Sequence, residues 1–433
     1  MSKLKEVKLL GMPLWMFLIL LVVTWGVGMT ESIPGDMVGA LCFATVVGTF
    51  IGFIGDRIPI WKDWLGGGML LTCLAAGAMS TFHLIPDSLV ETLNTFNGKT
   101  GFLNLYILVL VTGSVLSVNR KLLIRSLGGY IPCILSAIVF AFLFAGVAGI
   151  VVGIGPINAI LNYALPIMGG GNGAGAIPMS KIWGEASGQD PQIWYASAFA
   201  TLSLGNMIAV LIAALMNKLG EKKPEFTGNG ELMKTPADLG TQEAEIKPTV
   251  ADYASGLALG LFCFVFSGFY SSKISIINHA GLGFSIHQFA FMIILVALLN
   301  ISGLVPDNVR AGTRGMQQFF VKYMSLPLMV TVGIGTNLMD YVKVLNFQSL
   351  VVIAAVVVGA TLGAWLMAPI FKFFRIETVV TAALCMANGG GAGDIQVLGA
   401  SHRMELMSYA QISSRIGGAI MLVIASFMFS TFM

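Results

Sequence analysis

LPIMGGGNGAGA (residues 165–176) and CMANGGGAGD (residues 385–394) are the two stretches of this sequence that decide its fold. Five of the seven residues from 169 to 175 are glycine, and the second stretch contains three consecutive glycines. Each glycine in a helix interior lowers helix stability by about 1 kcal/mol relative to alanine, so neither stretch continues a regular helix. Both interrupt long apolar runs. We therefore expect the chain to break and turn at these two places.

The composition of the whole chain places those breaks in a lipid bilayer. Of its 433 residues, 56% are hydrophobic and only 10% are charged, whereas a soluble protein carries about 25% charged residues. The net charge of +3 gives no reason to expect a nucleic-acid partner. Five cysteines and four histidines are scattered without ligand spacing. They predict neither a disulfide nor a metal site beyond sodium sites, and we expect no cofactor other than a coupling ion.

Hydropathy and loop charges predict the number and direction of the membrane spans. A spanning helix needs about 20 mainly apolar residues, and lysine and arginine collect in cytoplasmic loops. Basic residues occur in every second loop, beginning with the N-terminal tail. We therefore expect a multi-pass protein of the bacterial inner membrane with a cytoplasmic N-terminus and an external C-terminus. The 11 predicted spans are 12–30, 36–55, 67–85, 103–119, 127–154, 193–217, 253–272, 286–305, 316–338, 347–371 and 406–432.

One long polar stretch, residues 218–252, divides the chain into two halves. It is rich in Lys, Glu, Gly, Pro and Thr, and such a composition predicts a flexible cytoplasmic linker. Each half has five spans, and an odd number of spans turns the second half upside down in the membrane. The predicted domains are a tail and first helix (1–35), a first repeat (36–217, hairpin near 157–188), the linker, and a second repeat (253–433, hairpin near 379–400).

The two glycine clusters occupy corresponding positions in these inverted halves. Paired, glycine-interrupted segments of this kind mark the binding site of many transporters. Non-helical backbone at membrane depth occurs only where protein or a water-filled cavity surrounds it. The alternative, that the glycines only permit close helix packing, suits isolated glycines better than clusters. The predicted fold is an all-α polytopic membrane protein with about 11 transmembrane helices and two re-entrant glycine-rich hairpins in inverted five-helix repeats.

Helix breaks of this kind expose backbone groups that bind ions. Unpaired N–H groups at the start of a half-helix favour an anion. Carbonyl oxygens of the unwound stretch suit a hard cation such as sodium. The two hairpins therefore predict both an anion site and a cation site.

Arg415 is the one basic residue that falls deep inside a predicted span. It lies about nine residues into the final span, which is about 13 Å into a ~30 Å hydrocarbon core. Placing arginine there costs at least about 2.5–3.5 kcal/mol on insertion scales. A guanidinium binds a carboxylate through two parallel hydrogen bonds, so Arg415 predicts a carboxylate substrate. The alternative is a structural ion pair with Asp394. The adjacent Ser413 and Ser414 offer hydroxyl oxygens to a cation or to the substrate.

The motifs GGGNGAGA (169–176), ANGGGAGD (387–394) and YAQISSRIGG (409–418) together resemble the 2-hydroxycarboxylate transporter family. This family contains sodium–citrate, malate and citrate–malate carriers. The resemblance implies a homodimer in which a transport domain moves, elevator-like, against a fixed dimerisation domain. It implies a substrate site that includes Arg415, Asn172 and Gly173, which we extend to the hairpin amides at Gly389 and Gly391. Coupling cations are expected near Ile167, Gly170, Cys385, Asn388, Ser413 and Ser414.

The sequence departs from the citrate carriers at two positions of the second motif. Those carriers have an arginine directly after the motif asparagine and a serine three residues later, where this chain has Gly389 and Ala392. A tricarboxylate would lose a charge partner and a hydroxyl, so malate or a similar dicarboxylate is favoured. We predict symport with sodium, since no Asp–Glu–His relay is visible in the spans. Proton coupling, precursor–product exchange, a membrane subunit of a sodium-pumping decarboxylase and an anion channel are the alternatives.

Overall fold

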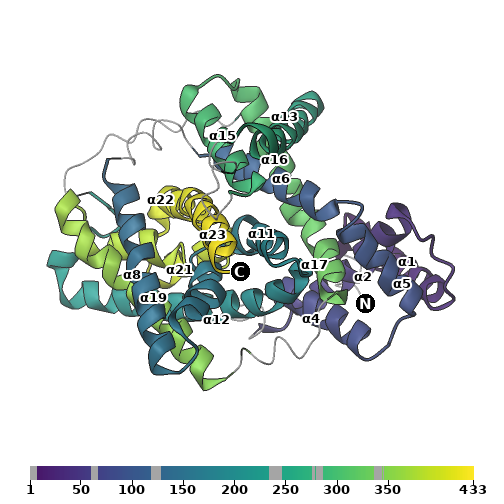
Figure 1. Cartoon of the computed structure of the whole chain (residues 1–433), viewed down its shortest axis with the longest axis horizontal. Helices are drawn as coiled ribbons and strands as arrows, with labels where there is room; N and C mark the ends of the chain where they lie inside the picture. Colours follow the sequence, from purple (N-terminus) through teal and green to yellow (C-terminus); the bar gives the residue numbers. More distant parts are fainter. Residues whose placement is uncertain are drawn as a thin grey trace. The chain divides into compact units, whose positions relative to one another are not determined.

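The protein is described by a computed structural model that covers residues 7–59, 67–118, 128–233, 246–275, 278, 286–335, 344 and 346–433. Within these residues the chain is almost entirely helical (Figure 1). It forms two compact units, one of residues 1–106 and 318–343 and the other of residues 107–317 and 344–433. Each unit takes segments from both sequence halves, so the compact units of the fold do not follow the boundaries of the predicted repeats.

The first unit packs short helices closely through glycine. A β-carbon placed on Gly48 would lie 2.8 Å from the Leu326 carbonyl oxygen, and one on Gly55 would lie 2.8 Å from Gly68 Cα. Asp36 caps one of these helices by accepting hydrogen bonds from the backbone N–H groups of Val38 and Gly39. The elements are β1 (Lys8–Leu9), β2 (Met12–Pro13), α1 (Leu14–Met29), α2 (Met37–Gly55), α4 (Gly67–Thr81), α5 (Asp87–Asn97), η5 (Phe320–Met324) and α17 (Ser325–Ile334).

The second unit contains the longer helices and both glycine clusters. Helices α8 and α19 run side by side (Figure 1). Gly359 allows this contact, because a β-carbon there would lie 2.5 Å from the Phe140 carbonyl oxygen. Ser136 Oγ donates to the Gly363 carbonyl over 2.9 Å across the same interface. Besides the cluster segments, its elements are the end of α6 (Phe102–Leu116), α8 (Tyr130–Val151), α12 (Pro191–Lys222), η3 (Pro224–Phe226), α13 (Val250–Phe269), η4 (Tyr270–Ile274), α15 (Gln288–Ser302), α16 (Asp307–Phe319), α19 (Phe347–Met367) and η6 (Ala368–Phe371).

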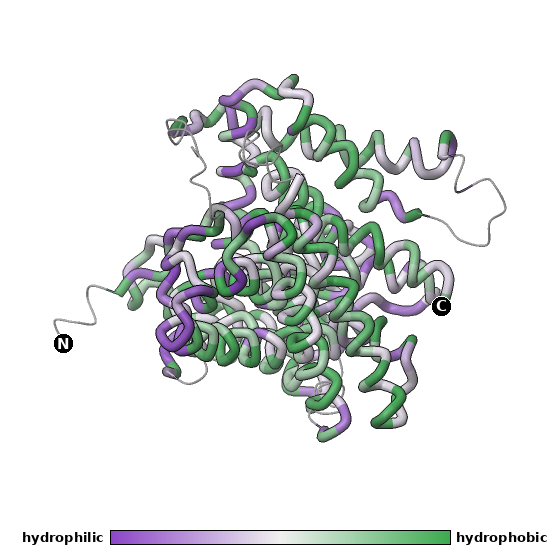
Figure 2. Tube along the Cα trace, turned by 90° about the vertical axis from the view of Figure 1, so that its left-hand side faces the viewer, coloured by the Kyte–Doolittle hydropathy of each residue, from purple (hydrophilic) through white to green (hydrophobic). Residues whose placement is uncertain are grey.

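The helices have the length and apolarity of membrane spans. Hydrophobic residues run along them, and hydrophilic residues gather mainly in the connections (Figure 2). Within the described residues, each of the 11 predicted windows overlaps a helical segment, which does not itself show how many of them cross the bilayer. In the described part of the chain, three shorter apolar helices are Leu14–Met29, Gly67–Thr81 and Gln288–Ser302. Among the described residues, seven segments are long and apolar enough to cross a bilayer: Met37–Gly55, Asp87–Leu116, Tyr130–Val151, Pro191–Lys222, Val250–Ile274, Phe347–Phe371 and Tyr409–Phe432. The chain is therefore a multi-pass membrane protein.

The polar stretch 218–252, predicted as a flexible linker, is helical or packed over part of its length. Helix α12 continues to Lys222, and the short helix η3 follows at once. Leu232 is only 3% exposed, and its carbonyl accepts a hydrogen bond from the Phe374 backbone N–H. Residues 234–245 lie outside the described residues. Helix α13 begins after Thr249, which forms a reciprocal capping box with Asp252.

Candidate functional site

The first glycine cluster breaks a helical segment, as the sequence predicts. The arm before the break consists of α9 (Pro156–Ala159), η1 (Ile160–Ala164) and α10 (Leu165–Ile167), and the arm after it of η2 (Asn172–Ala176) and α11 (Ile177–Ser187). Gly170 and Gly171, between the arms, have φ angles of +74° and +110°. Residues with a β-carbon rarely adopt such angles, so glycine is required at both positions.

The second cluster breaks in the same way. Its arms are α20 (Arg375–Thr378) with η7 (Val379–Leu384), and α21 (Gly391–Ala400), and Gly390 between them has φ +90°. The two breaks touch, because a β-carbon on Gly171 would lie 2.5 Å from Gly390 Cα. Segments more than 200 residues apart in sequence therefore meet through bare backbone. Figure 1 shows the helices that surround this meeting point, α11, α12, α21, α22 (Met407–Ile412) and α23 (Gly418–Phe432).

Arg415 lies beside this contact, on a π-helical turn. The turn η9 (Ser413–Gly417) joins α22 to α23, and a β-carbon on Gly170 would overlap the Ser414 carbonyl oxygen. Single π-helical turns inside α-helices are frequent at functional sites. Arg415 is half-buried, and its Nη1 donates to the Ser117 hydroxyl at the end of α6. The charges of Arg314 and Asp394 both act on it electrostatically.

The alternative ion pair between Arg415 and Asp394 is not formed in the part of the chain that the structure describes. Asp394 instead lies at the start of α21, only 1% exposed, against Ser414. Ser414 Oγ is 2.8 and 2.7 Å from its two carboxylate oxygens. Asn388 Nδ2 donates to the same carboxylate over 3.0 Å. The guanidinium of Arg415 thus remains available to another anion.

More acceptor oxygens surround the Ser414 hydroxyl than its one proton can serve. Besides the Asp394 carboxylate, the Cys385 carbonyl is 3.2 Å away and the Ala410 carbonyl is 2.9 Å away. A hydroxyl has a single O–H donor, so most of these oxygens lack a proton in this contact. Converging carboxylate, carbonyl and hydroxyl oxygens are the ligands that hard cations prefer. Three predicted cation residues, Cys385, Asn388 and Ser414, therefore meet in one cluster, to which the structure adds Asp394.

The other predicted cation residues lie around this cluster in different ways. The Ser413 hydroxyl pairs with Tyr130 on α8 at 2.7 Å instead of facing Asp394. Ile167, fully buried, packs near Gly205 of α12. Gly170 abuts Ser414, which places its backbone next to the cluster.

The side-chain NH2 group of Asn172 can donate a hydrogen bond to a ligand. It is 4% exposed, and its Oδ1 accepts a hydrogen bond from Tyr195 over 2.7 Å, which fixes the orientation of the side chain. Its Nδ2 is buried and has no hydrogen-bond partner among the described residues. An unsatisfied buried donor costs about 1–3 kcal/mol, so such groups usually mark a ligand or a water. The neighbouring Gly173 is less buried and lies close to Leu110.

The predicted substrate glycines of the second cluster face open space. Gly389 and Gly391 are exposed, and a β-carbon on Gly391 would have no atom within 4 Å. The backbone N–H of Gly389 donates to Asn206 Oδ1 over 3.1 Å, and Asn206 Nδ2 donates to Gln396 over 2.9 Å. Asn206 thus fixes this stretch from α12. Its role is not visible in the sequence, because a single asparagine in a long apolar helix gives no sign of what it faces.

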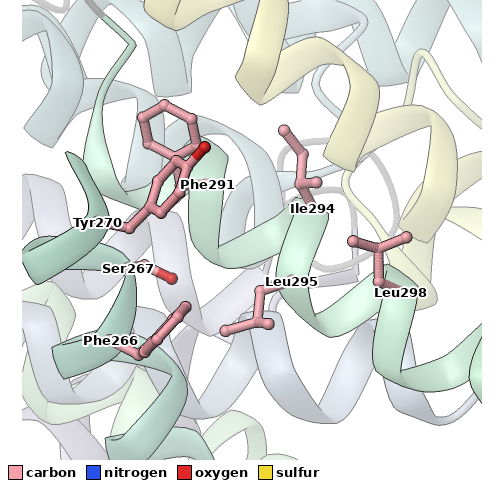
Figure 3. Close-up of a pocket in the computed structure, with 7 residues that line it drawn as sticks. All are labelled: Phe266, Ser267, Tyr270, Phe291, Ile294, Leu295 and Leu298. Atoms are coloured by element: carbon pink, nitrogen blue, oxygen red, sulfur yellow. The ribbon is translucent and has the colours of Figure 1, made fainter. Parts of the chain in front are cut away.

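A cavity of about 390 Å³ between α13 and α15 lies elsewhere in the second unit (Figure 3). No charged side chain lines it, so it does not suit a carboxylate. Its walls are apolar except for one hydroxyl each from Ser267 and Tyr270, and it is formed by Phe266, Ser267, Tyr270, Phe291, Ile294, Leu295 and Leu298. Among the described residues, no group of three His, Cys, Asp or Glu side chains could hold a metal ion.

The fold and these motifs define a family of membrane transporters. The chain belongs to the 2-hydroxycarboxylate transporter family, whose sequence model matches residues 9–427. It is 41% identical over 432 residues to a citrate/sodium symporter of Salmonella typhimurium, covering 99% of this chain and 96% of that protein. It is 32% identical over 434 residues to the malate transporter MleP of Lactococcus lactis subsp. lactis, covering 98% of each chain. Citrate transporter CitP of the same subspecies is 29% identical over 427 residues, covering 98% of this chain and 94% of that one. The family and these relatives are transporters and not enzymes, as the sequence predicts.

Proposed function

We propose that this protein is a secondary transporter that carries a 2-hydroxydicarboxylate, malate or a close analogue, together with sodium across the bacterial inner membrane. The observation that carries this proposal is Arg415. Its neighbour Ser414 abuts Gly170 of the first glycine break, and its guanidinium has no carboxylate partner among the described residues. A charge at this depth needs a counter-ion, and a substrate carboxylate supplies one.

The substrate would lie against groups that donate hydrogen bonds. Arg415 offers two parallel N–H groups to one carboxylate. The Asn172 Nδ2 amide, without a partner in the described part of the chain, suits a second carboxylate or the 2-hydroxyl. Gly389 and Gly391 leave open space at the second break. Because residue 389 is glycine, the site has no arginine at this position to bind the third carboxylate of citrate. The site therefore favours malate over citrate.

Sodium would lie in the oxygen cluster around Ser414. The Asp394 carboxylate is 1% exposed, and a buried carboxylate requires either a cation or a proton. Its oxygens, with those of Ser414 and Cys385, supply the hard ligands that sodium prefers. A sodium ion there would also offset the negative charge that the substrate brings. The rival coupling ion, a proton, would reside on the same carboxylate, so experiment must separate the two.

The proposed architecture is the one expected from the sequence. It has 11 spans, a cytoplasmic N-terminus and an external C-terminus, and it forms a homodimer in which a transport domain moves. The glycine segments are proposed to be re-entrant hairpins of an inverted repeat. Their support is that the two breaks occur at corresponding places of the two halves and touch through backbone at Gly171 and Gly390. A pair of half-helix ends that meet beside one arginine is the arrangement expected for a site reached alternately from each side.

Transport by the purified chain in proteoliposomes tests the proposal. Labelled malate should accumulate when a sodium gradient is imposed without internal substrate. Uptake that depends on a pH gradient and is unaffected by sodium would show that protons are the coupling ion. Uptake that requires substrate inside the proteoliposomes would show exchange. A competition series with citrate, lactate and succinate then ranks the substrates. A requirement for partner subunits would favour the decarboxylase alternative.

A further inference from the structure

A buried ion pair joins the two arms of the second hairpin segment at the end away from its glycines. Glu377 of α20 is fully buried, and Arg403, which follows α21, is 4% exposed. Arg403 Nε donates to Glu377 Oε1 over 2.9 Å. Burying two charges is costly and is tolerated when the geometry is good and further hydrogen bonds satisfy the remaining atoms. Arg403 meets this condition, because its Nη1 also donates to Asn217 Oδ1 over 2.9 Å and to the Ser401 carbonyl. Glu377 accepts through Oε1, whereas its Oε2 has no hydrogen-bond partner among the described residues.

A threonine from the stretch that connects the two sequence halves bridges the two members of the pair. Thr227 Oγ1 donates to Glu377 Oε1 over 2.7 Å and accepts from Arg403 Nη2 over 2.9 Å. It lies in a segment, residues 224–233, that is held to the same place by other contacts. Phe226 packs edge-on against Trp365 at 5.1 Å between ring centroids, and the Arg375 guanidinium lies 5.2 Å from the Phe226 ring. We call Thr227, Glu377 and Arg403 the base clamp.

The first hairpin segment has no equivalent among the described residues. No described ion pair joins its two arms, and Glu185 of α11 instead contacts His287, which precedes α15, at 2.7 Å. The two segments are therefore held differently at their bases, although their glycine breaks are alike.

We propose that the base clamp positions the glycine break of the second hairpin, and with it the cluster of Asn388, Asp394 and Ser414. Glu377 and Arg403 stand on the two arms that lead to this break, 11 residues before Asn388 and 9 residues after Asp394. Fixing the arms to each other and to residues 224–233 keeps the Asp394 carboxylate and the Cys385 carbonyl oxygen next to the Ser414 hydroxyl. The connecting segment thereby becomes part of the transport machinery. The consequence for sodium rests on the proposed function, whereas the positioning itself does not.

Alkylation of Cys385 tests the positioning without reference to transport. Cys385 lies at the break and its thiol is fully buried, so its reaction rate with N-ethylmaleimide reports how often the break opens. Thr227→Val removes both clamp hydrogen bonds, and also the one that Thr227 Oγ1 accepts from the Asn229 backbone N–H, while preserving side-chain shape. It should raise the rate at least about tenfold in a chain whose only cysteine is Cys385, because hydrogen bonds to charged groups are lost. Thr227→Ser keeps the hydroxyl and should restore the slow rate.

Two controls separate positioning from general destabilisation. Thr249→Val removes an exposed helix cap at the far end of the connecting stretch and should leave the Cys385 rate unchanged. Cys133, buried in α8, should stay protected in Thr227→Val when it is the only cysteine present. A Cys385 rate within twofold of the parent would overturn the proposal, and so would equal deprotection of Cys133.

The sodium activation curve gives the second readout. In Thr227→Val, the sodium concentration for half-maximal malate uptake should rise about tenfold, with a smaller change in malate affinity, because the clamp acts on the cation cluster. An unchanged sodium requirement beside a faster Cys385 reaction would refute the link to the cation. If the parent chain shows no sodium-dependent uptake, the proposed function is refuted. The Cys385 alkylation rates then test by themselves whether the base clamp positions the glycine break.

Discussion

Replacing Gly389 by arginine is predicted to shift the preference of this carrier from malate towards citrate. Gly389 is exposed at the second glycine break, and the nearest atom to a β-carbon placed there is Asn206 Oδ1 at 4.0 Å. Its φ angle is outside the left-handed region, so a residue with a side chain is accepted without backbone strain. The hydrogen bond from its backbone N–H to Asn206 is retained in the variant.

The size of the effect follows from the contact that the new guanidinium would make. A hydrogen bond to a charged group contributes about 1.5–3 kcal/mol. Since about 1.4 kcal/mol changes an equilibrium constant tenfold, citrate should bind about 10 to 100 times more tightly. Malate has one carboxylate fewer and should gain much less, because Arg415 already serves one of its carboxylates.

Competition against labelled malate in proteoliposomes measures this change as the ratio of the citrate and malate inhibition constants. Gly399→Arg is the matched control, since Gly399 is exposed near the far end of α21, away from the break, and a β-carbon placed on it would have no atom within 4 Å. The control should leave the ratio unchanged. A folded, malate-transporting Gly389→Arg protein with an unaltered citrate constant would refute the reasoning.

Three further substitutions test other parts of the site. Asp394→Asn keeps the shape but removes the buried charge, so malate uptake should lose its dependence on sodium; a preserved sodium activation curve would place the ion elsewhere. Gly171→Ala should abolish transport in a folded protein, because φ is +110° and the new β-carbon would lie 2.5 Å from Gly390 Cα; wild-type uptake would contradict the contact. Asn172→Ala should weaken malate binding about tenfold in a calorimetric titration, whereas Asn158→Ala, at an exposed position on the other arm of the same hairpin segment, should not; equal binding by both variants would show that the Asn172 amide does not contact malate.

The helices and the two breaks could be predicted from the sequence because their causes are local. Apolar runs of about 20 residues specify spans, and clustered glycines specify where a helix ends. Arg415 also stands out in the sequence as a candidate site residue, since a charge within a long apolar run is rare. Each of these features depends on residues that are close in the sequence and not on the residues that pack against them in the fold.

The contacts between distant side chains could not be predicted in this way. In the sequence, Asp394 suggests only a partner for Arg415, whereas the structure pairs it with Ser414, 20 residues away. The base clamp joins Thr227 to Glu377 across 150 residues, and its members lie in stretches that hydropathy assigns to loops. Composition predicts that residues 224–233 are flexible, because composition does not show that a threonine in this segment hydrogen-bonds to both members of a buried ion pair.

Binding of malate to purified Arg415→Lys protein, measured by calorimetry in sodium, tests the central claim most directly. Lysine keeps the charge but loses the planar pair of donors, so we expect the dissociation constant to rise about tenfold or more. The variant should fold and transport weakly at high malate concentration, as its remaining contacts are intact. An unchanged dissociation constant in folded Arg415→Lys protein would contradict the claim that this arginine holds the substrate carboxylate.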